Sequence, residues 1–148
     1  MWGTPVTTDD SSAGWYPSLR VVNSNPAISY YSGSNGDLRY VRASDVYGGT
    51  WNTPIVVDDS ADTVGLHPCL CVVAGNPAIS YYDYTNGKLK YARASDASGT
   101  SWDTPLVADD ENYAGEYSSM IFDEGKVFIS YQNYGTADLK FTVGSFPY

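Results

Sequence analysis

The stretch Asn25-Pro-Ala-Ile-Ser-Tyr-Tyr31 decides the fold, because the same seven letters return without a change as Asn76–Tyr82. A weaker copy, Lys126-Val-Phe-Ile-Ser-Tyr-Gln132, follows at nearly the same spacing. Long identical strings at a fixed spacing indicate that one structural unit has been duplicated along the chain. A spacing of about fifty residues is typical of repeat architectures, so the fold is expected to be built from similar units.

A second signature marks where each copy begins. It consists of Trp-x-Thr-Pro and an aliphatic residue, and a pair of Asp residues stands seven positions after the Trp. The signature starts at Trp2, Trp51 and Trp102. We therefore expect one domain over 1–148, a half-propeller by the strand pattern below, with copies over approximately 2–50, 51–101 and 102–148.

Turn-forming residues divide the middle copy into four short strands. We expect strands over 53–57, 67–73, 76–82 and 88–94, with Gly and Asn in the tight turns between them. Gly and Asn take the positive φ angles of hairpin turns at little steric cost. Repeated four-stranded meanders are typical of the blades of a β-propeller. The predicted fold class is therefore all-β, with three four-stranded blades per chain.

The composition excludes several classes of partner. The chain has 17 Asp and Glu against 8 Lys and Arg, a net charge of −9, so it lacks the basic clusters that nucleic acid binding needs. No apolar run is long enough to span a bilayer, so we expect no membrane insertion. Cys69 and Cys71 with a single His make a poor metal site, and we expect neither metal nor cofactor. The Tyr-rich, Lys-poor composition favours an extracellular location without specifying a compartment.

Two loops resemble a known family motif. Ser44-Asp-Val-Tyr-Gly-Gly-Thr-Trp51 and Ser95-Asp-Ala-Ser-Gly-Thr-Ser-Trp102 are similar to the Asp-box hairpin (S-x-D-x-G-x-T-W) of sialidase-like propellers, with one extra residue before the Trp. The resemblance implies that Asp45 and Asp96 hold the turns. The third copy departs from the motif at 144–148. The motif implies fold and not activity. The resemblance also implies that Trp51 and Trp102 pack between blades, and Trp2, which stands at the equivalent repeat position, is expected to be structural as well.

Three blades leave both ends of the arc open. The first strand, 4–8, corresponds to the outermost strand of a blade, whereas the third copy stops after its third strand at 139–143. In a two-fold ring these ends meet, so the first strand of one chain completes the last blade of the other. We therefore expect a homodimer with six blades, since closed two-fold assemblies are common and free strand edges promote aggregation. A fragment of a longer propeller, or an engineered piece, is the alternative.

Acidic and aromatic residues gather on the loops expected at one face of the propeller. Carboxylates accept hydrogen bonds from sugar hydroxyls, and aromatic rings stack on the apolar side of a pyranose. Similar sites on several blades would raise avidity by roughly 10²–10⁴. The candidate ligand-binding residues are Asp10, Trp15, Tyr16, Asp59, His67, Tyr84, Asp110, Tyr117 and Tyr134.

These features favour a non-catalytic, lectin-like protein that binds glycans. A sialidase-like enzyme needs three clustered Arg residues, whereas Arg42 and Arg93 occupy equivalent repeat positions. Glycosidase chemistry needs two carboxylates in different environments, and repeats supply copies of one. His67 has no Ser or Cys nucleophile motif beside it, so we expect no enzyme activity. A structural or engineered scaffold without a ligand and a sialidase-like glycoside hydrolase are the two alternatives.

Overall fold

The computed structural model describes residues 1, 3–9 and 12–145. They form an all-β structure of antiparallel sheets, as expected. Among them there is no helix long and apolar enough to cross a bilayer. Trp2 and Asp10, both singled out in the sequence, lie outside the described residues. Sheet I consists of β1 (Trp15–Val22), β2 (Asn25–Ser32), β3 (Asp37–Arg42) and β4 (Ile55–Asp58).

The other two sheets follow along the chain with the same strand order. Sheet II consists of β5 (Val64–Val73), β6 (Asn76–Asp83), β7 (Lys88–Arg93) and β8 (Leu106–Asp109). Sheet III consists of β9 (Ala114–Asp123), β10 (Lys126–Asn133) and β11 (Asp138–Ser145). The predicted strand 67–73 begins earlier, at Val64, because pairing with β6 continues across a local irregularity of register.

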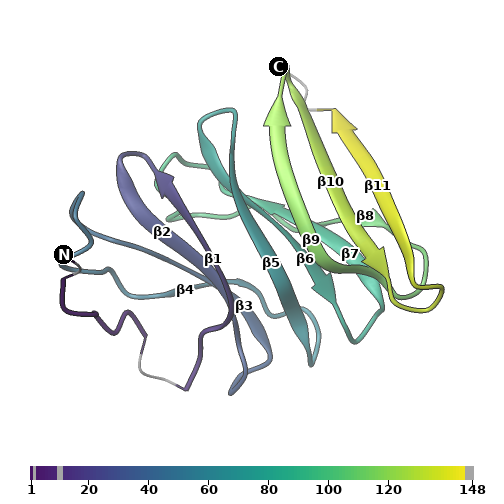
Figure 1. Ribbon diagram of the computed structural model, residues 1–148, viewed down its shortest axis with the longest axis horizontal. Helices are drawn as coiled ribbons and strands as arrows, with labels where there is room; N and C mark the ends of the chain where they lie inside the picture. The colour runs from purple at the N-terminus through teal and green to yellow at the C-terminus, as the bar shows by residue number, and fades with distance from the viewer. Residues whose placement is uncertain (2, 10–11, 146–148) are drawn as a thin grey trace.

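The three sheets stand side by side in chain order, each turned relative to its neighbour (Figure 1). Their first strands are joined by hydrogen bonds from backbone to side chain. Leu70 N–H donates to Ser18 Oγ at 3.0 Å, and Met120 N–H donates to Cys69 Sγ at 3.2 Å. Cys69 therefore does in sheet II what Ser18 does in sheet I. The arrangement is propeller-like, with β1, β5 and β9 on the inside.

The hydrophobic core lies between neighbouring sheets. The second strands of sheets I and II are mostly buried, whereas β10 of sheet III buries one face. Between sheets I and II, Leu38 packs with Leu70 and Ile79. Between sheets II and III, Leu89 packs with Met120, and these side chains are almost fully buried. Burial of this kind stabilises by about 25 cal/mol per Å² of apolar surface. Each sheet therefore depends on the next for its stability.

The same polar contact crosses both boundaries between sheets and also joins the N-terminal segment to sheet I, and we call it the carboxylate latch. The first Asp of each Asp pair accepts a hydrogen bond from a Tyr on the second strand of the following sheet and contacts a Lys or Arg on its third strand. The hydroxyl-to-carboxylate distances are 2.5, 2.6 and 2.5 Å in chain order. The three latches are Asp9–Tyr30–Arg39, Asp58–Tyr81–Lys90 and Asp109–Tyr131–Lys140.

The two loops with the Asp-x-x-Gly pattern are tight hairpins held by their Asp side chains. Asp45 accepts bonds from the backbone N–H groups of Tyr47, Gly49 and Thr50. Asp96 makes the equivalent set in the second hairpin. Each hairpin ends in a tryptophan whose indole N–H donates back into the turn at 2.9 and 3.0 Å. Trp102 also packs edge-on against Tyr40 of the preceding sheet, with centroids 5.2 Å apart.

One predicted strand is absent from the described residues. Residues 4–8 form no strand there, and they are mostly exposed. The reason is geometric, because β11, the predicted partner of this segment, belongs to sheet III at the other end of the arc (Figure 1). The pairing predicted for 4–8 is with β11 of a second chain, so the strand stays a prediction. The latch of Asp9 to Tyr30 nevertheless holds the end of this segment against sheet I.

Candidate functional site

Each inner strand is interrupted at the same place by an aromatic residue with positive φ. The φ angles are 55° at Tyr16, 50° at His67 and 51° at Tyr117. The pairing register with the second strand shifts at these positions. Positive φ is uncommon for residues other than Gly, and bulges of this kind redirect a side chain. Strained positions of this sort cluster at functional sites.

The three redirected rings pack against one another at a tilt across the sheets, with interplanar angles of 48° and 40°, and we call them the aromatic row. The ring centroids of Tyr16 and His67 are 4.2 Å apart, and those of His67 and Tyr117 are 4.1 Å apart. Tyr16 and Tyr117 are exposed, and His67 is half-buried. Burial lowers the pKa of His67, which favours the neutral form of its imidazole. The row is thus an uncharged aromatic surface open to water.

Loops from neighbouring sheets border the aromatic row. Val64 N–H donates to the Gly36 carbonyl at 2.9 Å, so the turn between β2 and β3 contacts the segment that enters sheet II. The same contact recurs between Ala114 and Gly87 at 3.3 Å. These bonds hold the turns after the second strands and the segments before the inner strands at one face of the molecule. The predicted candidates exposed on these elements are Trp15, Tyr84 and Tyr134.

Two residues that were not among the sequence candidates also lie at this face. Tyr113 is exposed and has a φ of 66°. Glu116 is half-buried, and burial raises the pKa of its carboxyl group. Burial also raises the pKa of Tyr82, and the nearby charge of Glu116 adds to that effect. The signal that could have indicated Glu116 is its position, because it directly precedes Tyr117 as Trp15 precedes Tyr16.

The predicted acidic candidates are placed differently from the aromatic ones. Asp59 and Asp110 are exposed on the segments that lead to the inner strands, and the backbone carbonyl of Asp110 accepts a bond from Lys88. The first Asp of each pair is instead occupied by its latch. No set of three or more His, Cys, Asp and Glu side chains in the described part of the chain is arranged to hold a metal ion.

Comparison with known proteins gives no family by sequence. No family model matches the chain, and no curated protein matches it. Solved structures do match. The α-L-arabinofuranosidase of Podospora anserina, solved with cellotriose, aligns with a TM-score of 0.60 and 15% identity over 95% of this chain and 49% of that chain. The catalytic domain of the GH62 α-L-arabinofuranosidase of Coprinopsis cinerea aligns with a TM-score of 0.59 and 14% identity over 97% and 49%.

The chain spans about half the length of these two structures. At this level of identity the likeness shows the fold, which is all-β and propeller-like. Both matched proteins are enzymes, and this finding overturns the expectation of a protein without enzyme activity. The symmetry argument failed because one side chain that differs between repeats, such as Glu116 where Trp15 and Leu66 stand, suffices to make a local environment asymmetric.

Proposed function

We propose that the protein recognises carbohydrate at the face formed by the aromatic row and its bordering loops. The observation that carries the proposal is the row itself, in which the rings of Tyr16, His67 and Tyr117 pack with centroids 4.2 and 4.1 Å apart and face water. Burial of these rings in the core would stabilise the fold more than their present exposure to water does. Their exposure, at a cost in backbone strain, favours a role in binding.

The chemistry of the surrounding groups suits a sugar. Aromatic rings cover the apolar face of a pyranose, while carboxylates accept hydrogen bonds from its hydroxyls. Asp59, Asp110 and Glu116 supply such carboxylates, and Trp15 and Tyr84 extend the aromatic surface. One of the matched structures contains cellotriose, which supports a carbohydrate as the class of ligand.

A second candidate function is hydrolysis of a glycosidic bond at the same face. Glycosidases use one carboxyl group that keeps its proton and a second carboxylate that is ionised. Burial raises the pKa of Glu116, as a general acid requires. The fold shared with two arabinofuranosidases favours this candidate. In this mechanism Glu116 would protonate the leaving oxygen of the sugar.

The proposal includes a closed ring. Two copies with three blades each would give six, which lies within the range of about four to eight blades that propellers use. In such a ring the hairpins that begin at Ser44 and Ser95 would act as Asp-box hairpins, with Trp51 and Trp102 packed between blades. Supporting this, Trp102 already contacts Tyr40 across the boundary between sheets I and II.

A glycan-binding screen on the intact chain tests the main proposal, followed by titration calorimetry of each hit. Tyr117→Ala is expected to weaken binding at least about tenfold, because the loss of one ring buried against the sugar removes roughly 1.5–3 kcal/mol. Tyr47→Ala is the matched control, since Tyr47 is also exposed but lies in a hairpin away from the aromatic row. Failure of all glycans to bind would reject carbohydrate recognition and favour a scaffold without a ligand.

Hydrolysis is tested separately with fluorogenic glycosides that include an α-L-arabinofuranoside. Activity that disappears in Glu116→Gln while sugar binding persists would support the catalytic candidate, because Gln keeps the shape of Glu but carries no acidic proton. Binding without any turnover of the panel would reject it.

A further inference from the structure

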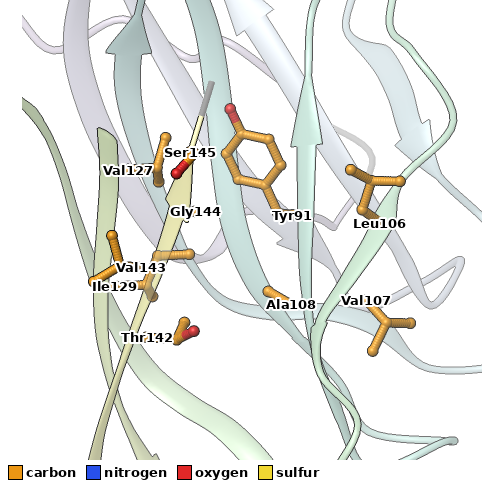
Figure 2. Close-up of a pocket in the computed structure, with 10 residues that line it drawn as sticks. All are labelled: Tyr91, Leu106, Val107, Ala108, Val127, Ile129, Thr142, Val143, Gly144 and Ser145. Carbon is orange, nitrogen blue, oxygen red and sulfur yellow. The ribbon is translucent and has the colours of Figure 1, made fainter. Parts of the chain in front are cut away.

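An apolar cleft lies at the boundary between sheets II and III. Figure 2 shows its walls, with Ala108 and Val107 of β8 on one side, Ile129 and Val143 of β10 and β11 on the other, and the ring of Tyr91 between them. Its volume is about 290 Å³. The cleft borders β11, which is the edge strand of sheet III.

The equivalent position between sheets I and II is filled. There Trp102 lies against Tyr40, the counterpart of Tyr91, with centroids 5.2 Å apart. The Tyr40 hydroxyl donates to the carbonyl of Ser98 in the same hairpin at 3.1 Å. The Tyr91 hydroxyl is buried and has no hydrogen-bond partner among the described residues. A group equivalent to the Trp102 hairpin is therefore expected to cover the cleft.

Both end faces of the arc expose side chains whose counterparts are buried. Leu19 of β1 is 59% exposed, whereas its counterparts Leu70 and Met120 in the other inner strands are 0% and 1% exposed. At the other end Phe141 of β11 is 62% exposed, whereas its counterpart Tyr40 is 1% exposed. One end presents the face that packs against a preceding sheet, and the other presents the face that packs against a following sheet. The two faces are complementary because the same pair of faces already packs twice within the chain.

We propose that the cleft binds the N-terminal segment of a second copy of this chain, with the indole of its Trp2 against Tyr91. In sequence, Trp2-Gly-Thr-Pro-Val is the counterpart of Trp102-Asp-Thr-Pro-Leu, the segment that begins the outer strand of sheet II. Residues 4–8 are mostly exposed and form no strand within their own chain. The latch at Asp9 places the end of this segment beside sheet I, as Asp58 does for sheet II at the end of β4.

The register of this contact follows from the two outer strands already formed. Ile55 of β4 pairs with Tyr40, and Leu106 of β8 pairs with Tyr91. The same register sets Val6 of the second copy opposite Phe141 of β11. This contact rests on the two-copy ring proposed above, and it names the residues through which the copies join.

A crosslinking experiment tests the register. Val6→Cys is placed in a chain with a mass tag, and Phe141→Cys in an untagged chain; the two are mixed and oxidised. Opposed residues on paired strands lie within disulfide range, so a tagged–untagged heterodimer is expected in high yield. The matched control replaces Phe141→Cys with Ala97→Cys, an exposed hairpin position in the middle sheet. A yield no higher than that of the control would overturn the proposal.

The role of Trp2 is tested by the dissociation constant of the dimer, measured by analytical ultracentrifugation. The wild-type mass should be twice 16.1 kDa. Trp2→Ala should raise the dissociation constant at least about 100-fold, as loss of a buried Trp implies, and Trp2→Phe should raise it less. Tyr84→Ala should weaken sugar binding and leave the dimer intact, so the two proposals can fail independently. A wild-type monomer, or a dimer that Trp2→Ala leaves unchanged, would reject docking in this cleft.

Discussion

The latch at the boundary between sheets I and II makes a quantitative prediction for the substitution Asp58→Asn. Asp58 Oδ2 lies 2.6 Å from the Tyr81 hydroxyl and 2.5 Å from Lys90 Nζ. Hydrogen bonds to charged groups contribute about 1.5–3 kcal/mol each, and removing one partner of a buried ion pair costs about 3–5 kcal/mol. The carboxylate of Asp83, 3.7 Å from Lys90, compensates in part, so we expect a loss of about 3 kcal/mol.

That loss is a large part of the stability of a domain, which is about 5–15 kcal/mol. The assay is urea unfolding followed by tryptophan fluorescence, with a lower midpoint and an unchanged slope expected. The melting temperature should fall by roughly 6–12 °C, at about 2–4 °C per kcal/mol.

Asp109→Asn is the matched control, because the latch geometry is the same but the side chain is 15% exposed, against 2% for Asp58. Solvent screens the more exposed pair, so its substitution should cost clearly less. An Asp58→Asn variant that is as stable as Asp109→Asn would refute the argument that burial of the latch sets its contribution.

Three further predictions concern stability. Gly99→Ala should lower the free energy of unfolding, measured in urea, more than Gly75→Ala does. Both glycines have positive φ, but a Cβ at Gly99 would lie 2.6 Å from a tyrosine ring, whereas a Cβ at Gly75 would have nothing within 4 Å. Cys69→Ala should lower the free energy of unfolding by about 1–3 kcal/mol, because the buried N–H of Met120 loses its partner. Cys69→Ser should cost less, because Ser18 accepts the same bond in sheet I, and equal losses would contradict this prediction. The hydroxyl and N–H groups of its hairpin lower the pKa of Asp45 to about 2, compared with about 3.9 in the unfolded chain. The stabilising effect of Asp45 is therefore complete above about pH 3.9 and is lost as the pH falls through about 2. A carboxyl pKa near 4 by NMR titration would be inconsistent with this prediction.

The repeat predicted the strands well because the turns between them depend on local chemistry. The predicted strand over 76–82 is observed as Asn76–Asp83, since Gly75 before it and the Asn-Gly turn after it specify their own backbone conformations. The strand expected over 4–8 stays a prediction, because its pairing depends on a neighbouring chain and not on local sequence.

The candidate site was harder to predict because its geometry comes from backbone strain. The aromatic residues Tyr16, His67 and Tyr117 could be aligned by repeat position, but nothing in their letters specifies a positive φ or the packing that follows from it. The Asp pairs show the same limit. Asp58 and Asp59 are adjacent and identical in sequence, and only the end of β4 determines which one turns inward to the latch.

The latches and outer strands also show that the unit repeated in the sequence is not the unit of folding. A copy that begins at Trp51 donates its first strand, β4, to the sheet of the preceding copy and its remaining strands to the next sheet. Each duplication therefore creates units that exchange strands with their neighbours, so that no unit forms a sheet by itself. A new copy inserted at such a boundary would be joined to both neighbours from the start, so the length of the array can change while every internal joint keeps the same design.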